Sequence, residues 1–115
     1  MVSSKITEAF KKHALIHDET QYSGDYTKGN NSADILAKLS VEIENDLDNG
    51  ASIIDSLLKE QNPGILIWAS CVSANMNYRK KDRIAILKEL SRNNEIGIQR
   101  FNAEMTLKEI NKSKK

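Results

Sequence analysis

The stretch NPGILIWASCVSANM, from Asn62 to Met76, decides the fold, and it holds the only proline, tryptophan and cysteine of the chain. Asn62 can accept a hydrogen bond from a backbone N–H as an N-cap. Pro63 suits the first helical position because its missing N–H would have no partner there. We therefore expect a helix to begin at Pro63. Apolar residues recur along it at the three- and four-residue spacing of one helix face; they are Ile65, Trp68, Ala69, Val72 and Met76.

A second apolar stripe, formed by Ile67, Cys71 and Ala74, lies beside the first. A helix with two apolar stripes is covered by neighbours on more than one side, so this segment is predicted to be the central buried helix. Large aromatic side chains dominate the burial energy of small domains, so Trp68 is predicted to fill the core rather than to stack on a ligand. The predicted core contains Ile65, Trp68, Ala69, Val72, Phe101 and Met105.

The same periodicity predicts further helices on both sides of this stretch, and no segment shows the alternation of a strand. The segment 22–32 is rich in Gly, Asn and Ser and is expected to form a loop or a frayed helix start. Asn49-Gly50 is expected to end the second helix in the left-handed conformation. In the last helix, Ile98, Phe101 and Met105 are expected to share the inward side. The expected helices are 3–21, 32–48, 51–59, 63–76, 83–92 and 95–111, followed by a frayed tail over 112–115.

The chain is therefore predicted to be a single all-α domain over residues 1–115, with about six helices in stacked antiparallel hairpins. Its 115 residues, 39% apolar and 5% aromatic, allow one modest core of Ile and Leu. The net charge of +1 hides an asymmetry between the two halves. Residues 1–58 carry five Lys/Arg and ten Asp/Glu, a net of −5, and residues 59–115 carry twelve and six, a net of +6. Such a charge distribution can orient a charged partner but does not identify it.

Cys71 is the only cysteine, which excludes an internal disulfide and suggests a buried, reduced thiol in a cytoplasmic protein. The N-terminal residues lack the apolar core of a secretion signal, and no stretch is long enough to span a bilayer. No membrane partner is expected.

Two groups of residues resemble a known family. They are Leu57-Leu58, Asn62-Pro63, Ile65 and Trp68-Ala69, and then FNAEMTLKEI from Phe101 to Ile110. Together they resemble the bacterial family called domain of unknown function two-zero-one-nine, over roughly residues 5–112. The resemblance implies a short HEAT/armadillo-like right-handed superhelix of α-hairpins, in which the Asn-Pro turn joins the helices of one repeat. The family usually carries an arginine where this chain has Leu66, so a salt bridge from that position is absent. It brings no activity that could be carried over.

A metal site is one interpretation of the two histidines. His13 and His17 stand four residues apart, a spacing that can hold zinc or iron, and Asp18 and Glu19 follow directly. However, the chain has no further histidine, its cysteine lies on another helix, and Ala14 stands where a metalloprotease helix has Glu. The pair is interpreted as a partly buried helix face, and no metal or cofactor is predicted.

RKKDR, from Arg79 to Arg83, is the densest basic cluster. A nucleic-acid contact would need more charges on the same surface and aromatic side chains for stacking, so a solvated face is preferred. The candidate interface residues for a protein partner are Leu66, Arg79, Lys80, Lys81, Arg83, Glu42 and Asp46, with Glu44 and Asp48 beside the last two.

No catalytic residue is predicted, because the chain has no glycine-rich phosphate loop and no Ser-His-Asp or Cys-His set on neighbouring elements. Glu104 is the candidate for an unusual environment, since it lies three residues from both Phe101 and Leu107. We expect it to be half covered and bonded to a helix end or to Thr106.

Three classes of function remain. The preferred one is a non-enzymatic protein-binding module, such as an immunity or accessory protein encoded beside a bacterial toxin or larger enzyme, because stacked hairpins expose a concave face. A nucleic-acid binder that uses the basic C-terminal half is the alternative. A small metal-binding enzyme that uses His13 and His17 is the third.

Overall fold

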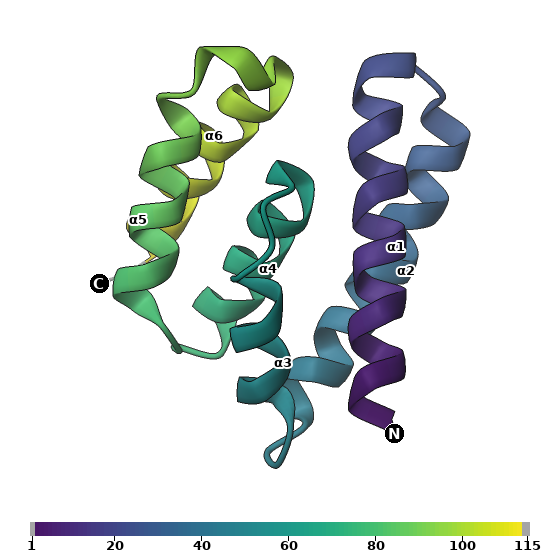
Figure 1. The fold of residues 1–115 in the computed structure, drawn as a ribbon, viewed down its shortest axis with the longest axis vertical. Helices are drawn as coiled ribbons and strands as arrows, with labels where there is room; N and C mark the ends of the chain where they lie inside the picture. Colours follow the sequence, from purple (N-terminus) through teal and green to yellow (C-terminus); the bar gives the residue numbers. More distant parts are fainter. Residues whose placement is uncertain (1, 114–115) are drawn as a thin grey trace.

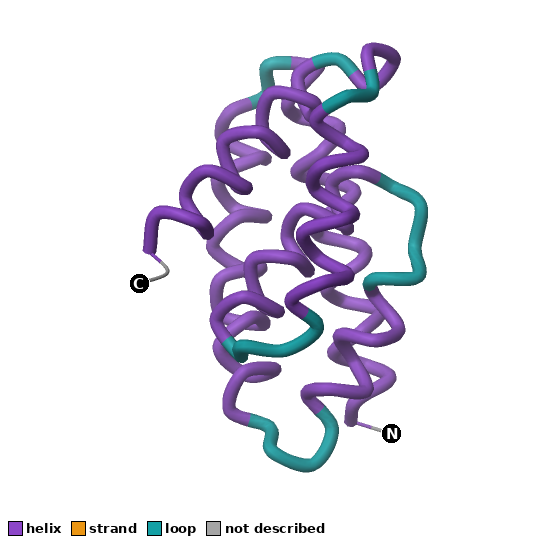
Figure 2. Tube along the Cα trace, turned by 90° about the vertical axis from the view of Figure 1, so that its left-hand side faces the viewer, coloured by secondary structure: helices purple, strands orange, loops and turns teal. Residues whose placement is uncertain are grey.

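Helices account for the whole regular structure of residues 2–113, the part of the chain that the computed structural model describes, with side chains described from 5 to 110. No strand occurs within these residues. The connections are short and lie mostly at the ends of the helices (Figure 2). The elements are α1 (Val2–Ser23), α2 (Tyr26–Asn45), α3 (Gly50–Leu57), α4 (Pro63–Asn75), α5 (Lys80–Ser91), the 3-10 helix η1 (Asn94–Ile96) and α6 (Ile98–Ser113).

The helices stack as antiparallel hairpins, and α4 is their centre. The α1/α2 hairpin lies on one side of α4 and the α5/α6 hairpin on the other, while α3 lies near the foot of the molecule (Figure 1). α4 contacts each of the other α-helices. The all-α class, the stacked hairpins and the central position of the Asn62–Met76 stretch are thereby confirmed.

The start of α4 follows the local chemistry of its sequence. The Asn62 Oδ1 atom accepts a hydrogen bond from the Ile65 backbone N–H at 3.1 Å, and Pro63 occupies the first turn. Gly64 is buried where α1 crosses, since a Cβ atom there would lie 2.8 Å from the Cβ of Asp18 and 3.2 Å from the carbonyl oxygen of Ala14. The absence of a side chain at Gly64 therefore lets α1 approach α4 closely.

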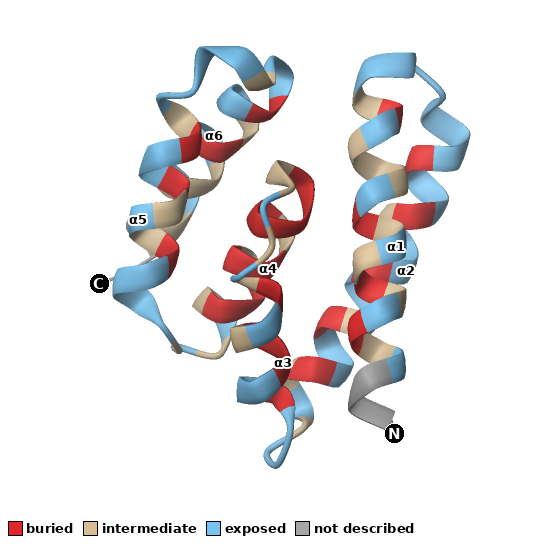
Figure 3. Ribbon diagram, viewed as in Figure 1, coloured by how far each residue is buried: buried red, intermediate tan, exposed pale blue. Residues whose placement is uncertain are grey.

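Two apolar clusters form the core, and α4 contributes to both (Figure 3). Ile65, Ala69 and Val72 belong to the first cluster, as predicted, together with buried residues of α1, α2 and α3. The second cluster joins α4 to α5 and α6 and consists of Leu66, Ile67, Leu87, Leu90 and Ala103. Because its two apolar faces are covered by different hairpins, α4 is the element that holds them together.

Of the predicted core residues, Phe101 and Met105 were wrong, and Trp68 was right only in part. Trp68 is only half-buried and packs against the edge of the first cluster. Phe101 is 58% exposed and Met105 is 43% exposed. α6 instead turns Gln99 and Ala103 inward. The small Ala103 allows close packing on the second cluster, so the stripe of larger apolar residues faces outward.

The second helix begins six residues earlier than predicted, at Tyr26 rather than Ser32. The Asp25 carboxylate caps it by accepting a hydrogen bond from the Lys28 N–H at 3.2 Å. Gly29 is buried against α1, where a Cβ atom would lie 2.6 Å from Thr20 Oγ1. The small residues of segment 22–32 suggested a loop, but Gly29 instead allows α1 and α2 to approach each other closely.

Gly50 was predicted to end the second helix, but it begins α3 instead. α2 already ends at Asn45, and Leu47 lies in the following turn, 96% exposed. A Cβ atom at Gly50 would lie 2.4 Å from the carbonyl oxygen of Ile43. Close backbone approach, and not a left-handed conformation, is therefore the reason for glycine at this position.

The last helix begins at Ile98, three residues later than predicted, because Gly97 adopts a positive φ of 62° after η1. Its C-terminal end is longer than predicted, since residues 112 and 113 are helical. Residues 114 and 115 of the predicted frayed tail lie outside the described residues. Within the described part of the chain, every helix is too short or too polar to cross a membrane.

Candidate functional site

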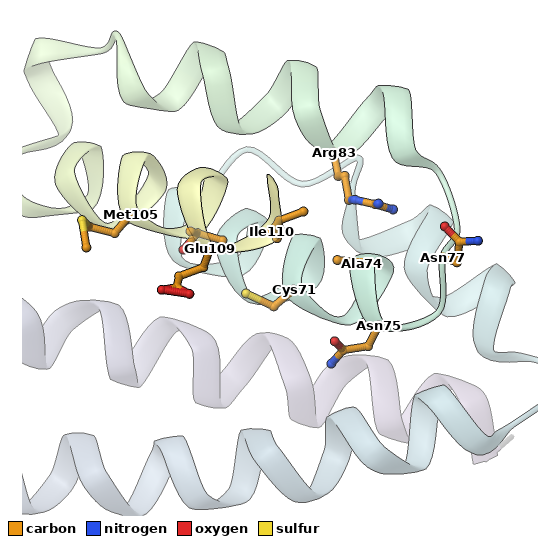
Figure 4. A pocket seen from close by; sticks show the side chains of 9 residues that line it. Cys71, Ala74, Asn75, Asn77, Arg83, Met105, Glu109 and Ile110 are labelled. Carbon is orange, nitrogen blue, oxygen red and sulfur yellow. The ribbon is translucent and has the colours of Figure 1, made fainter. Parts of the chain in front are cut away.

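Two cavities, of about 300 and about 600 Å³, open along the seam between α4 and α6 and share Cys71, Met105 and Thr106. We call them together the α4/α6 groove. The upper cavity, near the start of α4, also reaches α1 through His17 and Gln21. The lower cavity lies near the end of α4 (Figure 4), where its remaining lining residues are Ala74, Asn75, Asn77, Arg83, Glu109 and Ile110.

A polar network between α1 and α6, which we call the polar clamp, lies beside the upper cavity. The Asp18 carboxylate accepts hydrogen bonds from Gln99 Nε2 at 2.5 Å and from Asn62 Nδ2 at 3.2 Å. Asn102 Nδ2 donates to Gln21 Oε1 at 3.2 Å. Gln99 is only 3% exposed, so its amide depends on protein partners. The clamp ties the first helix to the last.

His17 and Trp68 meet at the wall of the upper cavity. Their ring centroids are 5.5 Å apart and their planes are nearly perpendicular, at 88°, which is a favourable edge-to-face geometry. Burial lowers the pKa of His17 below its ordinary value, and the Asp18 charge offsets part of this effect. Trp68 therefore packs a neutral imidazole on one side and the core on the other.

The structure does not gather metal ligands around the two histidines. His17 packs against Trp68, and the Nδ1 atom of His13 is buried without a hydrogen-bond partner. Among the described residues, no three His, Cys, Asp or Glu side chains come together as a metal-binding group.

Arg83 is the buried cation of the lower cavity. It is 4% exposed, and its Nη1 atom donates to the carbonyl oxygens of Tyr78, at 3.0 Å, and Ser73, at 3.3 Å. Ser73 Oγ also donates to the Tyr78 carbonyl oxygen. Arg83 forms no ion pair with any described residue, and its Nε atom is buried without a partner. Burial lowers the pKa of Arg83, yet a guanidinium stays protonated in proteins.

The outer side of α6 carries Ile98, Phe101 and Met105, which we call the α6 apolar edge. Ile98 and Met105 are each 43% exposed, and Phe101 is more exposed than either. Met105 also lines both cavities, so the apolar edge continues into the α4/α6 groove. Large apolar side chains gathered on one exposed helix side are unusual for a surface without a partner.

The basic cluster 79–83 is not one surface. Arg79 Nε pairs with Asp55 at 2.9 Å, and Arg79 Nη1 approaches Asp82 at 3.6 Å. Lys80 and Lys81 are exposed. Arg83 was predicted as an interface residue and is buried instead, because it continues the inward stripe of α5 that contains Leu87 and Leu90.

Leu66 was also predicted as an interface residue, and it is buried in the second core cluster at 7% exposure. The α5/α6 hairpin covers its side of α4. On the acidic side, Glu42 is exposed, whereas Asp46 is half-buried and accepts a hydrogen bond from the Asn49 N–H at 2.9 Å. Asp46 thus shapes the turn between α2 and α3.

Two further predictions concern Cys71 and Glu104. Cys71 is half-buried where the two cavities meet, and burial raises the pKa of its thiol. Glu104 was expected to be half covered but is exposed, because it lies outside the inward side of α6 that Gln99 and Ala103 form.

Neither the burial of Arg83 nor the polar clamp was predicted from the sequence. A signal for Arg83 existed, since it precedes Leu87 by four residues and Leu90 by seven, the spacing of one helix face. The clamp has no comparable signal, because Asp18 and Gln99 are separated by 81 residues. In comparisons with known proteins, no family model, curated protein or solved structure matches this chain.

Proposed function

We propose that this chain is a non-enzymatic protein-binding module that docks an apolar helix of its partner along the α6 apolar edge. The observation that carries the proposal is the exposure of Ile98, Phe101 and Met105 on one side of an otherwise well-packed helix. Burial of such side chains provides about 25 cal/mol per Å² of apolar surface, which favours association. The partner would therefore bury surface that this chain leaves in water.

A helix is the partner element that this edge suits best. The three residues follow the i, i+3, i+7 spacing with which helices pack against one another. α6 also lies in the outer hairpin of the stack, where a further helix would continue the packing of the fold. The upper cavity, which Met105 lines, can accept one larger side chain of that helix.

The wider setting rests on the resemblance to domain of unknown function two-zero-one-nine. It supports a bacterial immunity or accessory protein that acts in the cytoplasm. Recognition of nucleic acid has less support, because Arg79 is engaged by two carboxylates and Arg83 is buried. Lys80 and Lys81 are the exposed cations of the cluster that form no ion pair with a described residue.

Site-specific crosslinking tests the proposal. A photoreactive phenylalanine analogue placed at Phe101 should crosslink to a discrete protein in cells that encode the chain. The same analogue at Leu47, which is exposed but distant in the fold from α6, is the matched control and should not crosslink to that protein. Phe101→Asp and Met105→Asp should abolish binding of the purified partner without lowering the melting temperature. Identical crosslinks from both positions, or crosslinks to nucleic acid alone, would contradict the proposal.

A further inference from the structure

Arg83 carries a charge that the fold does not neutralise. Its contacts are backbone carbonyl oxygens and the Ser73 hydroxyl, and all of them use Nη1. Carbonyl groups at the end of α4 offer partial negative charge only. Buried cations are normally paired with a full negative charge, because removing a charge from water is costly. A guanidinium without a carboxylate partner at 4% exposure is therefore an unusual feature.

The space beside this cation has the dimensions of a ligand site. The lower cavity holds about 600 Å³, which is within the range of small-molecule sites. Its wall combines apolar groups of Met105 and Ile110 with polar residues that include Asn77, whereas the amide of Asn75, another lining residue, is bonded to Glu44. A ligand with one anionic group and an apolar body would match this combination.

We propose that the lower cavity binds a carboxylate attached to a short apolar body, with the carboxylate at Arg83. A guanidinium forms charge-assisted hydrogen bonds with a carboxylate, which are roughly twice as strong as neutral ones. Asn77 lies at the same end of the cavity as the Arg83 guanidinium (Figure 4) and can add an amide donor. The apolar body would extend along Cys71 towards Met105.

Glu109 is the other charged side chain of the cavity wall, and its position is compatible with this orientation. In Figure 4 its carboxylate lies towards the Met105 end, whereas the Arg83 guanidinium lies towards the Asn77 end. A carboxylate bound at Arg83 is thereby kept away from Glu109. The cavity wall therefore carries a positive charge towards the Asn77 end and a negative charge towards the Met105 end.

Either a free carboxylic acid or the C-terminus of a peptide could supply this group. Hexanoate is the first probe, at constant ionic strength, with 1-hexanol as the neutral probe of equal length. Amide chemical shifts in NMR spectra should move saturably with hexanoate at Asn75, Asn77 and Thr106. Hexanol should bind at least about tenfold more weakly, because it lacks the charge-assisted hydrogen bonds.

Variants separate the role of Arg83 from general charge effects. Arg83→Gln should weaken hexanoate binding about tenfold, and Arg83→Lys should restore part of it. Arg79→Gln removes a neighbouring cation that does not line this cavity, so hexanoate binding should stay unchanged. Glu109→Gln should tighten hexanoate binding, because it removes a negative charge from the cavity wall. This variant tests the proposal even if Arg83→Gln does not fold.

A peptide that ends in two apolar residues distinguishes the sources of the carboxylate. Tighter binding of the free-acid peptide than of hexanoate, with loss of binding on amidation, would identify a chain terminus as the ligand. Tighter binding of hexanoate would identify a small carboxylic acid. Equal binding of hexanoate and hexanol, unchanged hexanoate binding by Arg83→Gln, or shifts outside the lower cavity would overturn the proposal. Met105 belongs to both this cavity and the α6 apolar edge, but the variants at Arg83 and Glu109 leave the edge unchanged.

Discussion

Protonation of His17 is expected to oppose folding, because its ring packs edge-on against Trp68 in a partly buried site. The pKa of His17 is lowered by burial from its ordinary value of 6.5, so the unfolded chain binds a proton more readily than the folded one. The stability from His17 is therefore complete above about pH 6.5 and decreases as the pH falls towards the folded-state pKa. The melting temperature should fall on acidification across this interval.

The measurement is the melting temperature of the native chain and of His17→Asn between pH 8 and pH 5. The native chain should lose more stability on acidification than the variant. His13 is present in both proteins and therefore does not distinguish the two curves. Parallel curves would show that protonation of His17 does not oppose folding.

At the scale of the element, α2 depends on the cap at Asp25. Its carboxylate accepts the Lys28 N–H, which would otherwise have no partner within the helix. Asp25→Ala should cost about 0.5–2 kcal/mol and increase amide hydrogen exchange in the first turn of α2. Asp34→Ala, an exposed change within the same helix, is the control and should change stability by less than about 0.5 kcal/mol. Equal effects of the two variants would show that the cap contributes little.

At the scale of the whole molecule, the polar clamp holds α6 to α1. Asp18→Ala removes the acceptor of Gln99, whose amide is almost fully buried. An unpaired buried amide costs about 1–3 kcal/mol, so the global stability should fall by that amount. Amide hydrogen exchange should rise first in the N-terminal turns of α6. Asp18→Asn retains an acceptor oxygen and should lose less, whereas unchanged exchange in α6 with Asp18→Ala would show that the clamp does not hold the helix.

The sequence by itself determined the all-α class and the central helix. Both follow from interactions between residues close in the chain. The Asn62 cap, Pro63 and the periodic apolar residues act within a few residues of one another, so the start of α4 could be predicted to the residue. At Gly29 and Gly50 the same local chemistry indicated a loop and a helix end, respectively, whereas both residues lie in helices.

Only the tertiary structure decided which side of each helix is buried and where the candidate site lies. α6 has apolar residues on two sides, and the packing of Ala103 together with the bond from Gln99 to Asp18 selects the inward one. That choice exposes Phe101. The burial of Arg83 beside the lower cavity likewise requires the end of α4, α5 and α6 to meet. The physical reason is that burial depends on contacts between residues far apart in the chain, and periodicity along one helix does not contain them.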